Sequence, residues 1–204
     1  MSSRLRVALT FDAEHPDRSW CPPGNAERIL DILRDEEVRA TFFVQGRWAE
    51  SQPAAARRIA GEGHLVGHHS HYHARMPLLS DAGMDSDLAD GQAAIVGATG
   101  TDPRPWFRCP FGAGHDDPRV IERLEAAGYR DVHWDIDLED WEAHRTGPAI
   151  VAACLDSVRA HGDGAVVLLH TWPGGTGEAV GPIVAGLREM GADLVGIDEL
   201  ERLP

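Results

Sequence analysis

Apolar residues follow two different periods along this chain. From Leu5 to Phe11 they recur at every second position, which is the pattern of a strand with one buried face. Short apolar runs further along have the length and the flanking turn residues of buried strands. These runs cover residues 40–44, 64–67, 104–108, 131–136, 165–169 and 193–197.

Between the runs, apolar residues recur at intervals of three and four, which predicts amphipathic helices. The first helix begins near Asn25 and is expected to bury Ile29, Leu30 and Leu33. Others are expected over residues 53–60 and around the apolar stripes at 84–95, 120–124, 150–158 and 180–187. Strands that alternate with helices predict an α/β protein with a mainly parallel sheet of about seven strands. Because no internal repeat or linker is visible, we expect residues 1–204 to form a single domain.

The composition agrees with this architecture and removes several classes of function. With 43% hydrophobic residues among 204, the chain is long enough to bury one sizeable core. The net charge of -14 argues against nucleic acid or an anionic membrane as a main partner, because both attract basic surfaces. Composition indicates nothing about the oligomeric state.

The N-terminal residues and the cysteines indicate where the protein resides. The opening MSSRLRVALTFD has no apolar segment followed by a small-residue cleavage site, so no signal peptide is expected. No apolar run approaches the length of about 18 residues that a membrane span needs. Cys21, Cys109 and Cys154 are odd in number and widely spaced, unlike a disulfide framework. We therefore expect a cytoplasmic protein.

Polar side chains follow several predicted strands, where α/β folds bind their ligands. Asp12 and Glu14 follow the first strand and could serve as metal ligand and base, or only cap a turn. His69 and His73 are four residues apart, which on a helical turn would place both imidazoles on one side. Two histidines with one carboxylate and an open position are typical of a catalytic metal site. A polar loop in a chain with 11 histidines is the simpler interpretation.

Later strands end in residues suited to proton transfer and charge stabilisation. His170 follows an apolar strand, as a general acid or base would, although a core or rim histidine fits equally. Arg108 could keep a carboxylate ionised or form an ordinary ion pair. Asp140 could orient a histidine, and Trp141 could form one side of a groove. A solvated acidic turn would have the same composition.

Taken in order, five segments resemble the five motifs of the polysaccharide deacetylases, the NodB-homology domain of carbohydrate esterase family 4. The segments are Thr10-Phe11-Asp12, His69-Ser70-x-x-His73, Arg108-x-Pro110-Phe111-Gly112, Asp137-x-x-Asp140-Trp141 and Leu168-Leu169-His170. Residues 40–44 and 197–200 also resemble that family's second and last strands. Each motif is short, but their order along nearly the whole chain makes the set specific.

The resemblance implies a distorted (β/α) barrel of about seven strands, fewer than the regular barrel has. It also implies a metal-dependent hydrolase that removes an N-linked acetyl or other acyl group from an amino sugar or polysaccharide. Zinc is the expected ion, because histidine and carboxylate ligands suit it. The substrate would be an N-acetylated amino sugar, a glycoconjugate or a small amide.

His69 and His73 would bind the metal together with a carboxylate from the first motif. The family usually has two adjacent aspartates there, whereas Ala13 follows Asp12 in this chain and an acid recurs at Glu14. Our hypothesis is that Glu14 replaces the missing aspartate as metal ligand and that Asp12 is the general base. Two alternatives stay open: the reverse assignment of the two acids, and a weak or absent metal site.

The other motifs imply the remaining roles. Arg108 would be the partner of Asp12, and His170 would be the general acid held by Asp140. A second departure from the family is Cys109, where proline is usual, and it is expected to alter loop stiffness more than chemistry. The residues implied to contact the substrate are Phe111, through a nearby backbone N–H, and Trp141 and Leu168, which would line the acyl pocket.

Three rival interpretations remain. Relatives of the same fold open cyclic amides without a metal, and the altered first motif keeps that reaction possible. A sugar-binding module with a dead active site would keep the fold but lose an acid, a base or a ligand. A metal-dependent hydrolase of unrelated chemistry would bind metal without deacetylating amino sugars.

Overall fold

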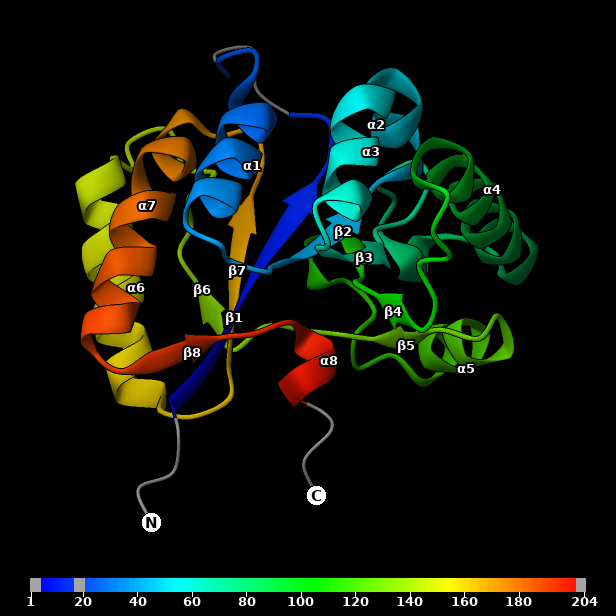
Figure 1. Cartoon of the computed structure of the whole chain (residues 1–204). Helices are drawn as coiled ribbons and strands as arrows, with labels where there is room; N and C mark the ends of the chain where they lie inside the picture. The colour runs from blue at the N-terminus through cyan, green and yellow to red at the C-terminus, as the bar shows by residue number, and fades with distance from the viewer. Residues whose placement is uncertain (1–4, 17–20, 201–204) are drawn as a thin grey trace. The chain divides into compact units, whose positions relative to one another are not determined.

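The structure, a computed structural model, describes residues 5–16 and 21–200. They form an α/β protein that divides into two compact units, each built from separate segments of the chain (Figure 1). The first unit takes its described residues from 1–11, 16–41 and 134–204, and the second from 12–15 and 42–133. The single domain over residues 1–204 stays a prediction.

The first unit contains parallel strands flanked by helices. Strand β1 (Leu5–Ala13), whose last residues belong to the second unit, pairs in parallel with β8 (Ala192–Leu194). Strand β6 (Ile136–Asp137) pairs in parallel with β7 (Ala165–His170). The helices are α1 (Asn25–Asp35), α6 (Gly147–His161), α7 (Gly174–Glu189) and α8 (Ile197–Leu200).

The predicted apolar stripes form the core of the first unit. Helix α1 buries Ile29, Leu30 and Leu33, as its sequence pattern predicts. Helices α6 and α7 lie side by side (Figure 1), and a Cβ added at Gly186 would lie 2.6 Å from a methyl carbon of Leu155. Glycine at that position therefore allows the two helices to pack closely.

The second unit is built on four parallel strands. The first residue of the first strand, Thr41, belongs to the other unit. The strands are β2 (Thr41–Val44), β3 (Leu65–His68), β4 (Trp106–Phe107) and β5 (Arg130–Asp131). The helices are α2 (Gly46–Ser51), α3 (Pro53–Gly61), α4 (Asp81–Thr99) and α5 (Pro118–Ala126), with short 3-10 turns η1 (Met76–Leu78) and η2 (Pro110–Gly112).

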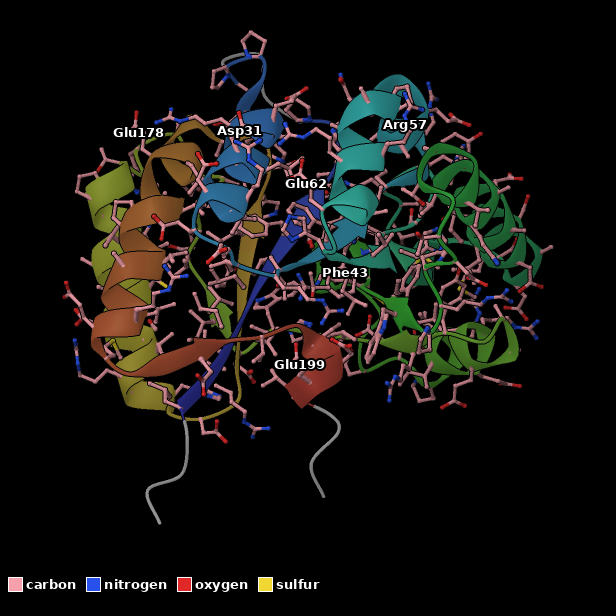
Figure 2. All side chains as sticks on the ribbon, in the orientation of Figure 1. Asp31, Phe43, Arg57, Glu62, Glu178 and Glu199 are labelled. Carbon is pink, nitrogen blue, oxygen red and sulfur yellow. The ribbon has the colours of Figure 1, made fainter. Side chains whose placement is uncertain are left out.

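Side chains of α4, α5 and β4 form one hydrophobic cluster in the second unit. It includes Met84, Leu88, Phe107, Val120 and Leu124. Figure 2 shows two contrasting side chains of this unit, the buried Phe43 on β2 and the exposed Arg57 on α3. The stripes predicted for α4 and α5 are thus confirmed as core positions.

Three predicted strands are shorter than the sequence pattern indicated. The run at 131–136 forms two strands, because Val132 N–H donates to Phe107 O on β4 whereas Asp135 N–H donates to Val166 O beside β7. The run at 104–108 pairs only at Trp106–Phe107. The last run ends at Leu194, and Ile197 begins a helical turn instead. Helix α2 was not predicted, because its six residues are too few to show a helical period.

Among the described residues, no helix combines the length and apolar character that crossing a membrane requires.

Candidate active site

The segment that follows β3 carries two of the predicted metal ligands and has an unusual backbone. Ser70 and His73 both adopt left-handed conformations, with φ of 61° and 59°. The predicted helical turn is therefore wrong, because the segment is a bent loop. His73 N–H donates to Ser70 Oγ at 2.9 Å, which closes the loop on itself. The two imidazoles still lie together, with ring centroids 5.0 Å apart for His69 and His73.

A buried aspartate from α4 fixes this loop. The carboxylate of Asp87 accepts the backbone N–H of His71 at 2.9 Å and that of Tyr72 at 3.1 Å. A charged acceptor makes such hydrogen bonds stronger than neutral ones, which offsets the cost of left-handed backbone at Ser70. Gly91, one helical turn further along α4, has no room for a Cβ, because His68 Nε2 occupies that space. Asp87 is a positioning residue that our sequence analysis missed, since only the fold brings it to this loop.

The tautomer of His69 follows from its surroundings. Its Nδ1 lies 2.9 Å from the carbonyl oxygen of Arg108, and because a carbonyl only accepts, Nδ1 must carry the proton. Nε2 is then the nitrogen that can bind a metal, and an outer hydrogen bond of this kind is typical of metal-binding histidines. Burial disfavours a charged ring, but the nearby carboxylates of Asp12 and Glu14 outweigh it and raise the pKa of His69.

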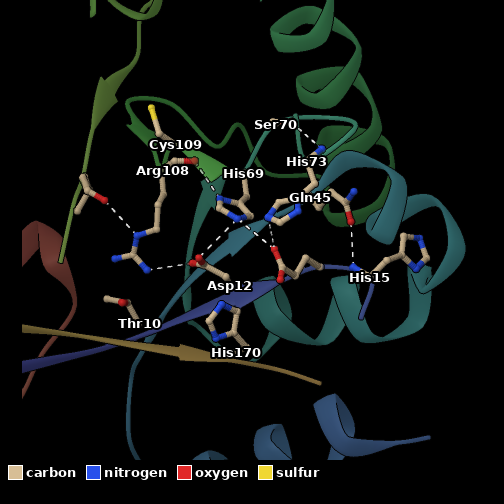
Figure 3. A network of polar contacts seen from close by, with 12 residues as sticks. Thr10, Asp12, His15, Gln45, His69, Ser70, His73, Arg108, Cys109 and His170 are labelled. Atoms are coloured by element: carbon tan, nitrogen blue, oxygen red, sulfur yellow. Dashed lines mark hydrogen bonds and ion pairs between the residues drawn. The ribbon is translucent and has the colours of Figure 1, made fainter. Parts of the chain in front are cut away.

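Glu14 lies within ion-pair distance of both imidazoles, whereas Asp12 lies between Arg108 and His69 (Figure 3). The Oε2 atom of Glu14 is 2.6 Å from His73 Nε2 and 3.2 Å from His69 Nε2. The nearest approach of Asp12 to His69 Nε2 is 3.5 Å. One potential ligand atom each from Glu14, His69 and His73 lies within 4.8 Å of the others, a grouping that fits a single divalent ion.

Asp12 instead binds Arg108, as the sequence suggested for this arginine. Arg108 NH1 lies 2.9 Å from Asp12 Oδ1, and both side chains are almost completely buried. Arg108 Nε donates to the carbonyl oxygen of Val132 at 3.1 Å, and its guanidinium carbon lies 4.1 Å from the centre of the Phe43 ring. Burial lowers the pKa of Arg108, and the adjacent carboxylate of Asp12 opposes that shift. One oxygen of Asp12 is therefore fixed, while the other faces His69.

The other two predicted catalytic residues form a pair in the first unit. His170, the last residue of β7, has its Nδ1 2.7 Å from Asp140 Oδ1, and its backbone N–H donates to Asp140 Oδ2 at 2.8 Å. Thr176 donates its hydroxyl to the same carboxylate at 2.5 Å. Asp140 is 1% exposed, so it orients the His170 ring from within the protein.

The three predicted substrate contacts differ in exposure. Phe111 is 48% exposed, has a left-handed backbone, and packs its ring 4.4 Å from that of His73. Trp141 is partly buried and Leu168 is buried in β7. Arg75 places its guanidinium 4.2 Å from the Phe111 ring centre. Of these three residues, Phe111 and Trp141 have the exposure that stacking on a sugar needs.

Cys109, the second departure from the family pattern, is buried. Burial is the main cause that raises the pKa of its thiol, and the negative charge of Asp131 raises this pKa further. A raised pKa makes this thiol a poor nucleophile, and its expected effect on the stiffness of the loop stays a prediction.

Comparison with known proteins tests the family resemblance. The sequence pattern of the polysaccharide deacetylase family matches residues 2–132. A chitooligosaccharide deacetylase of Rhizobium leguminosarum bv. trifolii is 37% identical over 170 residues, covering 83% of this chain and 73% of that protein.

Solved structures extend the match to the fold. A family 4 carbohydrate esterase from Streptomyces lividans, in complex with acetate, has a TM-score of 0.80 and 33% identity, and the match covers 93% of this chain and 91% of that one. A mutant of a Bacillus anthracis pseudoenzyme of the same family, with restored activity, has a TM-score of 0.85 and 28% identity, covering 97% and 68%. The predicted fold class, a distorted (β/α) barrel of the NodB type, is confirmed. The chain belongs to the polysaccharide deacetylase family.

Proposed function

We propose that this protein is a metal-dependent deacetylase that hydrolyses the N-acetyl group of an amino sugar or of its polymer. The observation that carries the proposal is a buried donor set, Glu14, His69 and His73, next to an aspartate that Arg108 holds in place. Deacetylases of amino-sugar polymers among the relatives support the same reaction. Water adds across the amide bond, and acetate and a free amine are released.

The donor set fits zinc or a similar divalent ion. It offers two imidazoles and one carboxylate, which leaves positions for water and substrate. A bound ion of this kind lowers the pKa of water and polarises an acyl carbonyl. Glu14 is the proposed carboxylate ligand, because its Oε2 lies 2.6 Å from His73 and 3.2 Å from His69, whereas Asp12 lies 3.5 Å from His69 and pairs with Arg108. His69 is held by the carbonyl of Arg108, so its ligand nitrogen needs no reorganisation.

Asp12 is the proposed general base. Arg108 holds one oxygen of its carboxylate, and the other would accept the proton of the attacking water. His170 is the proposed general acid, which gives its proton to the departing amine while Asp140 stabilises the protonated ring. The backbone N–H near Phe111 would stabilise the oxyanion, and Trp141 and Leu168 would line the acyl pocket.

The rival interpretations make different predictions. The Bacillus anthracis neighbour is a pseudoenzyme, so the fold alone does not decide activity. Retention of Asp12, Arg108, Glu14 and both histidines favours an enzyme over a dead sugar-binding module. A cyclic-amide hydrolase would need no metal, and acetate release from N-acetylglucosamine oligomers that stops on addition of a chelator would exclude it.

Substituting Glu14 with alanine is expected to raise the zinc concentration needed for half-maximal acetate release by more than tenfold. Loss of an outer partner alone costs about 10–100-fold in metal affinity, and a direct ligand costs at least as much. The measurement is a zinc titration of the chelated enzyme, with acetate release from N-acetylglucosamine oligomers as readout. Glu50→Ala, at an exposed position of α2, is the control. An unchanged zinc requirement in Glu14→Ala together with a raised one in Asp12→Ala would reverse our assignment.

A further inference from the structure

A second cluster of potential metal ligands lies in the second unit, apart from the residues assigned above. It consists of His115, Asp131 and His133, whose ligand atoms all lie within 4.8 Å of one another. The rings of His115 and His133 are stacked, with centroids 4.0 Å apart and planes inclined by 14°. None of the three takes part in the proposed reaction, and the family motifs quoted above include none of them.

The cluster joins two segments that position Arg108. His115 lies in the turn that follows η2, a few residues beyond Phe111. Asp131 ends β5, and its Oδ1 accepts the backbone N–H of Cys109 at 2.9 Å. His133 follows Val132, whose carbonyl oxygen accepts from Arg108 Nε. An ion held by these three residues would therefore cross-link the loop after Arg108 to the end of β5.

We propose that His115, Asp131 and His133 form a second site for a divalent transition metal, apart from the proposed reaction, and that zinc is the ion these ligands suit best. Two imidazoles and one carboxylate favour zinc, copper or nickel over magnesium and calcium, which prefer oxygen ligands. Asp131 is already oriented by the Cys109 N–H and offers its other oxygen to an ion. The two ring planes are nearly parallel, so His115, which is exposed, would rotate for both rings to turn a nitrogen toward the ion. Water would complete the coordination.

Zinc stoichiometry in four full-length proteins tests this site independently of catalysis. The proteins are the wild type, Glu14→Ala, His115→Ala/His133→Ala, and the variant that combines all three substitutions. After equilibrium dialysis against zinc, we expect two ions per chain in the wild type, one in each of the next two proteins, and none in the combined variant. In the Glu14→Ala background, zinc should also raise the melting temperature, and the two histidine substitutions should abolish that rise.

A matched control removes two other histidines with side chains open to solvent. His144→Ala/His161→Ala should bind as much zinc as the wild type, because neither residue lies in a ligand cluster of the described residues. An unchanged zinc content in His115→Ala/His133→Ala would overturn the second site and show that the two rings only stack. If circular dichroism showed that this variant is unfolded, the zinc content of the single variant His115→Ala, in the exposed turn, would test the site instead. If Glu14→Ala bound as much zinc as the wild type, the assignment of Glu14 as a ligand of the catalytic metal would be wrong, whatever the result at the second site.

Discussion

Replacing Asp12 with asparagine is expected to lower kcat for acetate release by about 10²–10⁴-fold, the usual contribution of a general base. Asparagine keeps the size of the side chain and can still contact Arg108, but it cannot accept the proton of the attacking water. The zinc concentration for half-maximal activity should stay near that of the wild type, because Glu14 and the two histidines are the proposed ligands. The measurement is steady-state acetate release over a zinc titration.

A control variant and the zinc requirement together show whether Asp12 acts as a general base or as a metal ligand. Asp90→Asn, on the exposed side of α4, makes the same chemical change away from the site and should leave kcat unchanged. A large rise in the zinc requirement of Asp12→Asn would mean that Asp12 is a ligand, as in the reverse assignment. A kcat close to that of the wild type would mean that another group removes the proton.

The substitution Arg108→Leu is expected to destabilise the fold by about 3–5 kcal/mol, which is typical when one partner of a buried ion pair is removed. Arg108 is fully buried and Asp12 is 3% exposed, so the remaining carboxylate would lose its charged partner in a medium that solvates it poorly. The hydrogen bond to Val132 O and the contact with the Phe43 ring would also be lost. The measurement is urea unfolding of the chelated protein.

A double-mutant cycle identifies the source of that loss. Adding Asp12→Asn to Arg108→Leu should restore part of the stability, because burying an amide costs less free energy than burying an unpaired carboxylate. Arg57→Leu, on the exposed face of α3, should change stability by less than about 0.5 kcal/mol (Figure 2). A loss in Arg108→Leu as small as that of the control would contradict the buried-pair account, and additive effects of the two substitutions would attribute the loss to packing.

Local patterns were enough to predict the elements that have regular packing. The stripe at Ile29, Leu30 and Leu33 reports a buried face directly, because burial and backbone period are coupled within one helix. The alternation from Leu5 to Phe11 predicted the strand, but β1 is buried on both faces from Val7 to Ala13, which alternation alone does not indicate. The family motifs then located the histidines and Arg108 at strand ends. Strand lengths were less predictable, since a strand such as β4 continues only as far as its neighbours offer hydrogen bonds.

The geometry of the ligand set depended on contacts that no local pattern contains. The loop through His69 and His73 is not helical, because Asp87 from α4, the first α-helix after the loop, binds its backbone. The choice between Asp12 and Glu14 was open in the sequence, whereas in the structure Arg108 binds Asp12 and Glu14 lies next to both histidines. His115 and His133 are separated by a helix and a strand, so their pairing could not be read from spacing.

The sequence by itself thus determined the kind of fold, the family and the residue types available for chemistry, because periodicity and short motifs are local properties of the chain. The tertiary structure alone decided which carboxylate faces the imidazoles, how their loop bends, and which further histidines meet. These are contacts between residues far apart in the sequence, and each is set by hydrogen bonds and burial that exist only once the chain has folded.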